Sequence, residues 1–315
     1  MPKTKKSQNI FNHYFELARK NHDNFLFDVF NTALVIFAIS ISLAFFIWMA
    51  KVFSGKILIS SVAFYLGNWP IYWYGIIFAV AFLAGLWLIT KQAKREKIDP
   101  DLLINFVFGT VVCGFFGARI IFVLLSWAYY VQHLSQIFNI WQGGLSLHGA
   151  LLGGLIFIVV YSLNKKMNYW KIFDLFAPAM LLGQVIGRWG NFFNQELFGY
   201  PTNYFLKMYV AVYNRPWTHK NFAYFHPVFL YESILCFLAL IILLVLRKKK
   251  ILRTGDLFLL YLLFYSAIRF VIEFIRIEPK VFIGLTIAQV LSIVLIIAVG
   301  AIFYFRKKKI NGQKR

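Results

Sequence analysis

The chain has 315 residues, of which 60% are hydrophobic, and its mean hydropathy is +0.68. A soluble domain is closer to half apolar, so this composition excludes an ordinary soluble protein and predicts an all-α polytopic membrane protein. Sheet is not expected, because lipid cannot satisfy open sheet edges. The net charge of +21 does not predict nucleic-acid binding, because the basic residues follow the order of the apolar segments.

Apolar runs that reach or approach the ~20 residues needed to cross a bilayer predict about eight transmembrane helices. The expected spans are residues 29–50, 72–90, 101–128, 147–163, 172–187, 226–246, 255–275 and 283–305. The first span has no internal ionisable residue, and its polar leader is too long for a cleaved signal peptide. It is therefore interpreted as an appended, uncleaved anchor.

The lysines and arginines sort sharply between the two sides of these spans. With the N-terminus inside, 23 of the 33 fall on inner segments, eight on outer segments and two within spans. This is the positive-inside pattern, and it predicts that both termini lie in the cytoplasm. The surplus positive charge can also hold anionic membrane lipids.

Three parts are expected along the chain. Residues 1–60 form a cytoplasmic segment and the extra anchor, residues 61–305 form a transmembrane body, and residues 306–315 form a basic cytoplasmic tail. Residues at about 190–225 contain many aromatic side chains and are expected to form a cap on the outer face. Aromatic anchoring at the membrane interface is the alternative interpretation of this stretch.

The stretch from Gly187 to Gly199 is the most informative part of the sequence, because it places polar residues and glycines directly after an apolar run. Polar groups at a membrane boundary cost free energy unless something pairs with them or uses them. Arg188 offers a planar charged fork that suits a phosphate. The residues that can orient this fork or bind a polar headgroup are Asn191, Asn194 and Glu196. Snorkelling explains Arg188 alone, but not the amides and glycines around it.

Two further groups open the fourth and sixth spans. His148 is expected near the outer interface, where it acts as a general base or is satisfied by a neighbouring carbonyl. His226, Tyr231 and Glu232 open the sixth span. Glu232 needs a partner about one turn inside the membrane, and an arginine is the expected one. A structural ion pair remains an open alternative to a binding role for this carboxylate.

The seventh span carries charge within its apolar sequence. Arg269 and Glu273 are four residues apart and share a helix face with Tyr265. An arginine within a span costs ~2.5–3.5 kcal/mol, so Arg269 is a functional candidate. Arg119 is a second basic residue within a span, and Asp174 is expected to be interfacial. Together these residues predict a cavity that binds a phospholipid headgroup from the outer leaflet.

No metal or cofactor is expected. Cys113 and Cys236 both lie in apolar runs and are interpreted as small buried hydrophobic residues. The sequence has no C-x-x-C spacing or other ligand pattern typical of a metal site.

These motifs resemble the prolipoprotein diacylglyceryl transferase family of bacterial inner membranes. The resemblance runs from about Ile71 to Ser292, and the 187–199 stretch fits G-R-x-G-N-F-x-N-x-E-x-x-G at every fixed position. The H-P-x-x-L-Y-E element, the Tyr-x-x-x-Arg-x-x-x-Glu helix and the Trp73-Tyr74-Gly75 element also match. By this resemblance, the family's functional positions are Tyr74, His148, Arg188, Asn191, Glu196, Gly199, Tyr265, Arg269 and Glu273. Ala150 and Ala288 stand where the family usually has glycine, and the first span is an addition to the family's usual seven.

The resemblance implies a reaction in the bacterial cell membrane. Phosphatidylglycerol donates its diacylglyceryl group to the lipobox cysteine of a prolipoprotein, and glycerol phosphate leaves. His148, or a network through Tyr74 or Tyr265, would take the thiol proton. Arg188 and Arg269 would stabilise the departing phosphate.

Other functions remain as alternatives to transfer. A phospholipid transporter or flippase also needs arginines in a membrane, but the polar motifs here cluster toward one side. An intramembrane serine protease would have to pair Ser146 with His226. A non-catalytic scaffold would not explain Arg269 together with Glu273.

Overall fold

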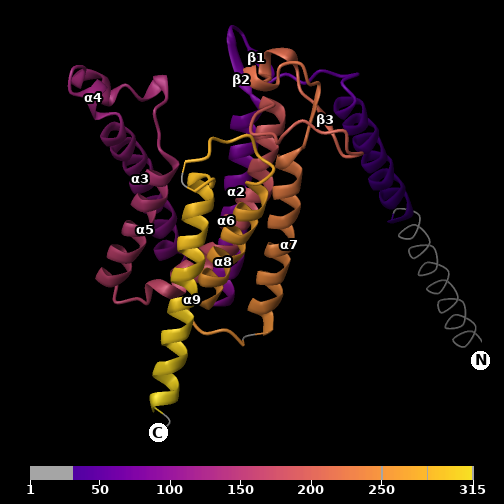
Figure 1. Ribbon diagram of the computed structural model, residues 1–315. Coiled ribbons are helices and arrows are strands. Elements are labelled where there is room, and N and C mark those ends of the chain that lie inside the picture. Colours follow the sequence, from indigo (N-terminus) through magenta and orange to yellow (C-terminus); the bar gives the residue numbers. More distant parts are fainter. Residues whose placement is uncertain (1–30, 250, 282, 314–315) are drawn as a thin grey trace, which may run out of the picture. The chain divides into compact units, whose positions relative to one another are not determined.

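The computed structural model describes residues 31–249, 251–281 and 283–313 (Figure 1). The predicted polar leader and the first residues of the first span lie outside these ranges. The chain divides into two compact units. One consists of the residues up to Ile59 together with Lys207–Tyr209, and the other contains the remaining residues from Ser60 onward.

The first unit is built on the helix Asn31–Phe53, which is apolar and exposes nearly all of its side chains. The helix extends three residues beyond the predicted span 29–50. Gly55 then turns the chain with a positive φ of 76°, which glycine adopts without strain. A side chain at Gly55 would overlap the ring of Tyr209, so the chain passes closely over that ring.

The second unit is a set of long helices, as the composition predicts. The long helices are α2 (Trp73–Arg95), α3 (Pro100–Leu125), α5 (Leu147–Asn164), α6 (Tyr169–Asn194), α7 (Val228–Lys249), α8 (Asp256–Ile272) and α9 (Ile287–Gln313). The short helix α4 (Trp127–Tyr130) follows α3. These elements confirm the all-α polytopic membrane class.

Six described helices are long and apolar enough to cross a membrane: Asn31–Phe53, α2, α3, α5, α7 and part of α9. The predicted spans 172–187 and 255–275 coincide with α6 and α8, which are not among these six. Helix α8 has 17 residues, one fewer than the shortest of the six, and α6 carries several polar residues of the candidate site. The total of eight spans therefore stays a prediction.

Side chains that accept backbone hydrogen bonds mark the starts of several helices. Asp99 caps α3 with Pro100 in the first helical position, Ser146 caps α5 and Asn168 caps α6. Asp174 in α6 plays the same part for another helix. Its carboxylate accepts hydrogen bonds from the backbone of Gly255 and Phe258 and so caps α8. The side chain of Asp174 is buried in this role, and its expected place at the membrane interface stays a prediction.

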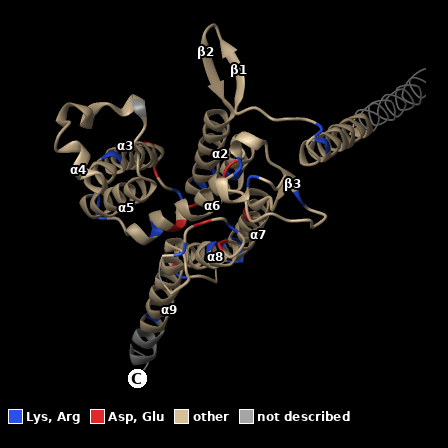
Figure 2. Ribbon diagram, turned by 45° about the horizontal axis from the view of Figure 1, so that its top comes forward, with Lys and Arg blue, Asp and Glu red and all other residues tan. Residues whose placement is uncertain are grey.

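Helix α6 organises the packing of the second unit. Helix α2 lies along α6 (Figure 1). Helices α7 and α8 also pack on α6, and α9 packs on α8. The hydrophobic core joins apolar side chains from α2, α3, α5, α6, α7 and α8, and Cys236 is one of its fully buried members. Figure 2 shows basic and acidic residues together among α6, α7 and α8.

Helices α3 and α5 form a closely packed pair. Gly117, Gly149 and Gly153 lie at their contact, where an added Cβ on any of them would overlap backbone atoms of the other helix. Small residues allow membrane helices to approach in this way. Ala150 is accommodated beside Gly114, whose own position leaves little room for a methyl group.

Four short strands lie between the long helices, and this corrects the expectation that the chain has no sheet. Strands β1 (Val62–Leu66) and β2 (Trp69–Tyr72) form an antiparallel hairpin in which Val62 pairs with Tyr72 and Leu66 with Trp69. Strands β3 (Met208–Tyr209) and β4 (Tyr224–Phe225) are two residues each. Lipid excludes sheet edges only from its hydrocarbon region, and these strands lie outside the predicted spans except for Tyr72, at the edge of one of them. Short 3-10 helices complete the connections: Leu134–Phe138, Ile140–Gln142, Val212–Asn214 and Trp217–His219.

Candidate active site

The centre of the candidate site is the carboxylate of Glu232, near the start of α7. Its side chain is 1% exposed. Arg188 of α6 places Nη2 2.6 Å from Oε1, and Arg269 of α8 places Nη1 3.5 Å from Oε2. Arg188 and Arg269, which were predicted separately, therefore contact the same buried carboxylate. The expectation that Glu232 pairs with an arginine is confirmed.

The contact between Arg188 and Glu232 is an ion pair rather than an aligned hydrogen bond. Oε1 of Glu232 lies close to the guanidinium, but no donor points at it with hydrogen-bond geometry among the described residues. A buried carboxylate without aligned donors is costly unless charge compensates it. The two guanidinium groups supply that charge.

Arg269 is held from a second side by Glu273, as their four-residue spacing predicts. Nη2 of Arg269 lies 2.9 Å from Oε2 of Glu273, and Arg276 Nη1 lies 3.8 Å from the same oxygen. Arg276 also pairs with Glu278, at 2.7 Å. Burial lowers the pKa of the Arg276 guanidinium, and the positive charge of Arg269 lowers it further. The cluster therefore alternates charges from Glu232 to Glu278.

Sequence reasoning gave Arg276 no role, although it stands at the end of the polar stretch that begins at Tyr265. Helical spacing could not have found it, because α8 ends at Ile272 and Arg276 lies beyond the helix, in a bridge with Gly199.

The other contacts of Arg188 come from the residues around it in the 187–199 stretch and from α8. Nη2 donates to the Tyr265 hydroxyl at 3.3 Å, and Nη1 reaches Asn191 Oδ1 at 3.5 Å. Asn191 in turn donates to Glu196 at 2.8 Å. The predicted residues Arg188, Asn191, Glu196 and Tyr265 therefore form one connected network with Glu232.

Gln195 ends α6 in the left-handed conformation, with φ of 48°, and its side chain is buried. Its Oε1 accepts hydrogen bonds from the backbone of Ala211 at 2.8 Å and from the side chain of Asn214 at 3.2 Å. Gln195 therefore anchors the segment that follows α6. Sequence reasoning missed this role, because the partners lie 16 and 19 residues away.

Gly199 is the point where three segments meet. Its N–H donates to the His226 carbonyl at 3.0 Å, and the next residue, Tyr200, donates to the Ile275 carbonyl at 2.8 Å. An added Cβ at Gly199 would lie 2.7 Å from the Ile275 carbonyl oxygen. Glycine is needed here because the backbone passes so closely, and the bridge to Arg276 ties this segment to the charged cluster.

His226 and Tyr231 form a separate contact at the start of α7. The Nδ1 atom of His226 lies 3.2 Å from the Tyr231 hydroxyl, which donates to the Leu206 carbonyl at 3.3 Å. Their predicted part in substrate binding stays a prediction. The geometry shows that they hold the segment near Leu206 against α7.

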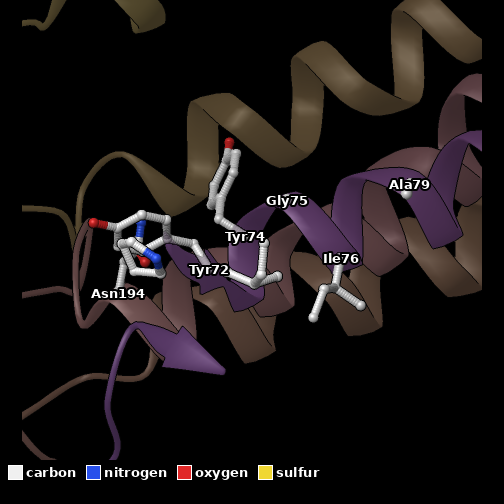
Figure 3. Close-up of a pocket in the computed structure, with 8 residues that line it drawn as sticks. Tyr72, Tyr74, Gly75, Ile76, Ala79 and Asn194 are labelled. Carbon is white, nitrogen blue, oxygen red and sulfur yellow. The ribbon is translucent and has the colours of Figure 1, made fainter. Parts of the chain in front are cut away.

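Tyr74 and Asn194 line an open, mostly apolar cavity of about 690 Å³. The other lining residues are Pro70, Ile71, Tyr72, Gly75, Ile76 and Ala79. Figure 3 shows Tyr72 beside Asn194, and Tyr74 and Ile76 leaving α2 in opposite directions. An added Cβ on Gly190 would lie 2.7 Å from the Tyr74 ring, so this tyrosine packs against α6 two residues beyond Arg188.

Two predicted residues lie apart from the cluster. Arg119 donates to backbone carbonyls of the loop between α4 and α5, including those of Gln136 at 2.7 Å and Gly144 at 2.9 Å. It holds that loop together. His148 is exposed in the first turn of α5, and no hydrogen bond or ion pair of its ring is found among the described residues. Its role as the base stays a prediction, as does substrate binding by Arg119.

Within the described ranges, no group of three or more His, Cys, Asp or Glu residues is placed to hold a metal ion. The cluster around Glu232 itself offers guanidinium, carboxylate, amide and phenol groups. Such a set suits the binding of an anion with oxygen ligands.

A comparison with known families identifies the family of the chain. The family model of prolipoprotein diacylglyceryl transferase matches residues 61–305, which include every residue of the candidate site. The chain belongs to the prolipoprotein diacylglyceryl transferase family.

Phosphatidylglycerol–prolipoprotein diacylglyceryl transferases of several bacteria are similar to this chain. A phosphatidylglycerol–prolipoprotein diacylglyceryl transferase of Synechocystis sp. is 43% identical over 75% of this chain and 85% of its own. A relative from Bacillus cereus is 42% identical over 81% of this chain and 94% of its own length. One from Thermosynechococcus vestitus is 40% identical over 76% of this chain and 90% of its own length. None of these comparisons favours a lipid transporter, a protease or a scaffold. The helix Asn31–Phe53 precedes the residues matched by the diacylglyceryl transferase model.

Proposed function

We propose that this chain transfers the diacylglyceryl group of phosphatidylglycerol to the lipobox cysteine thiol of a prolipoprotein, with release of glycerol phosphate. Its relatives carry names that state these substrates. The observation that supports the assignment of the site is the meeting of Arg188 and Arg269 on the buried Glu232.

The arginine pair is suited to bind the phosphodiester. A guanidinium carries five N–H donors in a planar fork. Arg188 directs its two terminal nitrogens at Glu232, Tyr265 and Asn191 through contacts that include long ones of 3.3 and 3.5 Å, so a phosphate oxygen can compete for these donors. Arg269 is braced by Glu232 and Glu273 and needs little reorganisation when the lipid binds.

The reaction has one bond formed and one bond broken. The cysteine sulfur forms a thioether bond with the carbon of the diacylglycerol that carries the phosphate, and the bond between that carbon and the phosphate oxygen breaks. The electron pair of this bond leaves with the oxygen as glycerol phosphate. The two guanidinium groups stabilise the charge that develops there, and the thiol proton passes to a base.

The base is proposed to be His148, or a network through Tyr74 or Tyr265. Tyr265 contacts Arg188, and Tyr74 packs beside α6 two residues further along. The His148 side chain is exposed and would meet the thiol as the precursor binds. The apolar cavity beside Tyr74 and Asn194 offers room for an apolar part of a substrate.

The proposed setting is the bacterial cell membrane, with both termini in the cytoplasm and the charged cluster toward the outer leaflet. The distribution of lysine and arginine along the sequence supports this orientation. Residues 1–60 are proposed to form the added anchor, and residues 61–305 the catalytic body with its outer cap.

The test is reconstitution of the purified protein in nanodiscs with a synthetic lipobox peptide. With phosphatidylglycerol, mass spectrometry is expected to find a diacylglyceryl adduct on the peptide cysteine, together with glycerol phosphate. A peptide with serine in place of that cysteine is the matched control and should gain no adduct. Movement of labelled lipid between leaflets without any adduct would contradict the proposal.

A further inference from the structure

The segment that joins α6 to α7 is folded rather than loosely connected. The cap is defined here as residues 200–206 and 210–225. Thr202 N–H donates to the Tyr224 carbonyl at 3.1 Å, and Val210 N–H donates to the Ala223 carbonyl at 3.1 Å. Arg215 donates to the Val210 carbonyl at 2.9 Å. Together with the anchor from Gln195, these bonds fix the path of the backbone.

This folded cap displays large aromatic side chains to its surroundings. The exposed fractions are 90% for Phe205, 87% for Trp217, 77% for Tyr213 and 70% for Tyr204. A fixed backbone that presents such side chains gains no core stability from them. Exposed apolar groups of this kind mark a surface that contacts another phase or partner.

The charge of the segment indicates the chemistry of that partner. Between Glu196 and Glu232 the sequence has no acidic residue, whereas it has Lys207, Arg215 and Lys220. Lys220 Nζ lies 4.4 Å from the centre of the Trp217 ring, so the exposed cation and the exposed indole stand together. Tryptophan and tyrosine favour the membrane–water interface, and nearby lysines favour anionic headgroups.

We propose that the cap docks on the anionic surface of the bilayer, with Phe205 and Trp217 inserted at the headgroup level and Lys220 beside a lipid phosphate. The cap joins the two helices that carry Arg188 and Glu232, so docking would hold the outer ends of these helices at the depth of the headgroups. The proposal rests on the orientation given under the proposed function, but not on the transfer reaction.

A bilayer fits these observations better than a peptide does. The exposed aromatic residues lie on two separate turns, around residue 205 and residues 213–217, and a bilayer can receive both. A bound peptide would call for a groove, and the cavity beside Tyr74 is lined by no residue of the cap.

The test measures depth in the membrane and not product formation. A cysteine at Phe205, in a Cys113→Ala and Cys236→Ala background, carries an environment-sensitive fluorophore in nanodiscs of phosphatidylglycerol. The expected result is a blue-shifted emission that nitroxide-labelled lipids quench. Because one lysine contributes ~1 kcal/mol near an anionic surface, Lys220→Gln should lower the ratio of docked to undocked cap about fivefold. Trp217→Ala should also weaken quenching, whereas its exposed neighbour, Thr218→Ala, should not.

The unmodified chain supplies a second readout that needs no cysteine background. Hydroxyl-radical oxidation of Trp217 should be lower in phosphatidylglycerol nanodiscs than in phosphatidylcholine nanodiscs. Equal oxidation in both, or a label that stays in water, would overturn the proposal. Protection that arises only when a lipobox peptide is added would overturn it in favour of a peptide surface. Since neither readout requires transfer, an inactive protein with a docked cap would contradict only the proposed function.

Discussion

Glu232 is the residue on which the charged cluster depends, because it lies between two guanidinium groups from different helices. Each arginine has other partners, but only this carboxylate contacts both among the described residues. Its position fixes the separation of the two proposed phosphate ligands. A change at Glu232 should therefore affect both arginines at once.

Glu232→Gln is expected to reduce transfer about 10²-fold or more, because displacement of positioned groups by ~1 Å can have this effect. The variant should also unfold at a lower temperature, since removing one partner of a buried pair typically costs ~3–5 kcal/mol. Peptide lipidation and thermal unfolding in detergent measure the two effects. The control is Glu278→Gln, which removes a more exposed carboxylate from Arg276 and should have little effect on either. Normal transfer by Glu232→Gln would contradict the positioning role.

Gly199 tests the cluster through the backbone. In Gly199→Ala the new methyl group would meet the Ile275 carbonyl, so the bridge to Arg276 must shift. The variant should melt at a lower temperature and lose activity. Gly183→Ala is the matched control, because an added Cβ there meets no atom within 4 Å. If both variants unfold at the wild-type temperature, the close backbone approach at Gly199 does not contribute to stability.

Much of the residue-scale picture could be predicted, because helical spacing brings known partners together. Arg269, Glu273 and Tyr265 share a helix face by their four-residue intervals, and a buried Glu232 required an arginine. Spacing could not show which arginine would supply it. Spacing also could not show that Arg119 donates to the carbonyls of a loop. That contact depends on how the chain folds back between residue 119 and residue 144.

At the scale of elements, α8 is held in place from α6. The Asp174 carboxylate accepts from two N–H groups at the start of α8, and Asp256 pairs with Arg306 of α9 at 2.8 Å. These contacts lie at the end of α8 opposite to Arg269. They set the position of α8, and hence of Arg269, relative to α6.

Asp174→Asn should destabilise the protein by about 0.5–2 kcal/mol, the usual effect of losing a helix cap. An amide keeps one acceptor but loses the charge that favours a helix start. Thermal unfolding in detergent measures this effect, with Asp101→Asn in the first turn of α3 as the control. An unfolding temperature equal to that of Asp101→Asn would argue against the cap.

Helix boundaries were predicted less well than helix existence, for a physical reason. Hydropathy falls at Arg188, so the fifth span was expected to end at residue 187, yet α6 continues to Asn194. Its last turns are polar because they build the site, and the backbone hydrogen bonds of a helix do not require apolar side chains. The β1–β2 hairpin escaped prediction because the reasoning about lipid does not apply to connections outside the spans.

For the molecule as a whole, the proposed orientation places the cap and the basic loop after α7 on opposite sides of the membrane. A cysteine replacing Asn203 should react with a membrane-impermeant maleimide in spheroplasts, whereas a cysteine replacing Ile251 should react only after lysis. The unmodified chain gives the background from Cys113, because Cys236 is buried. The reverse pattern of labelling would invert the proposed orientation.

In the proposed reaction, Arg188 and Arg269 together stabilise the phosphate that leaves the lipid. The most direct measurement is the initial rate of peptide lipidation in phosphatidylglycerol nanodiscs for Arg188→Ala, Arg269→Ala and Arg306→Ala, each checked for folding by gel filtration. The first two should be slower by about 10²–10³-fold, the usual effect of losing such a group. Arg306→Ala removes an arginine of α9 that pairs with Asp256, at the end of α8 opposite to Arg269. This variant should stay close to the wild-type rate. A folded Arg188→Ala or Arg269→Ala protein that lipidates the peptide at the wild-type rate would contradict the claim.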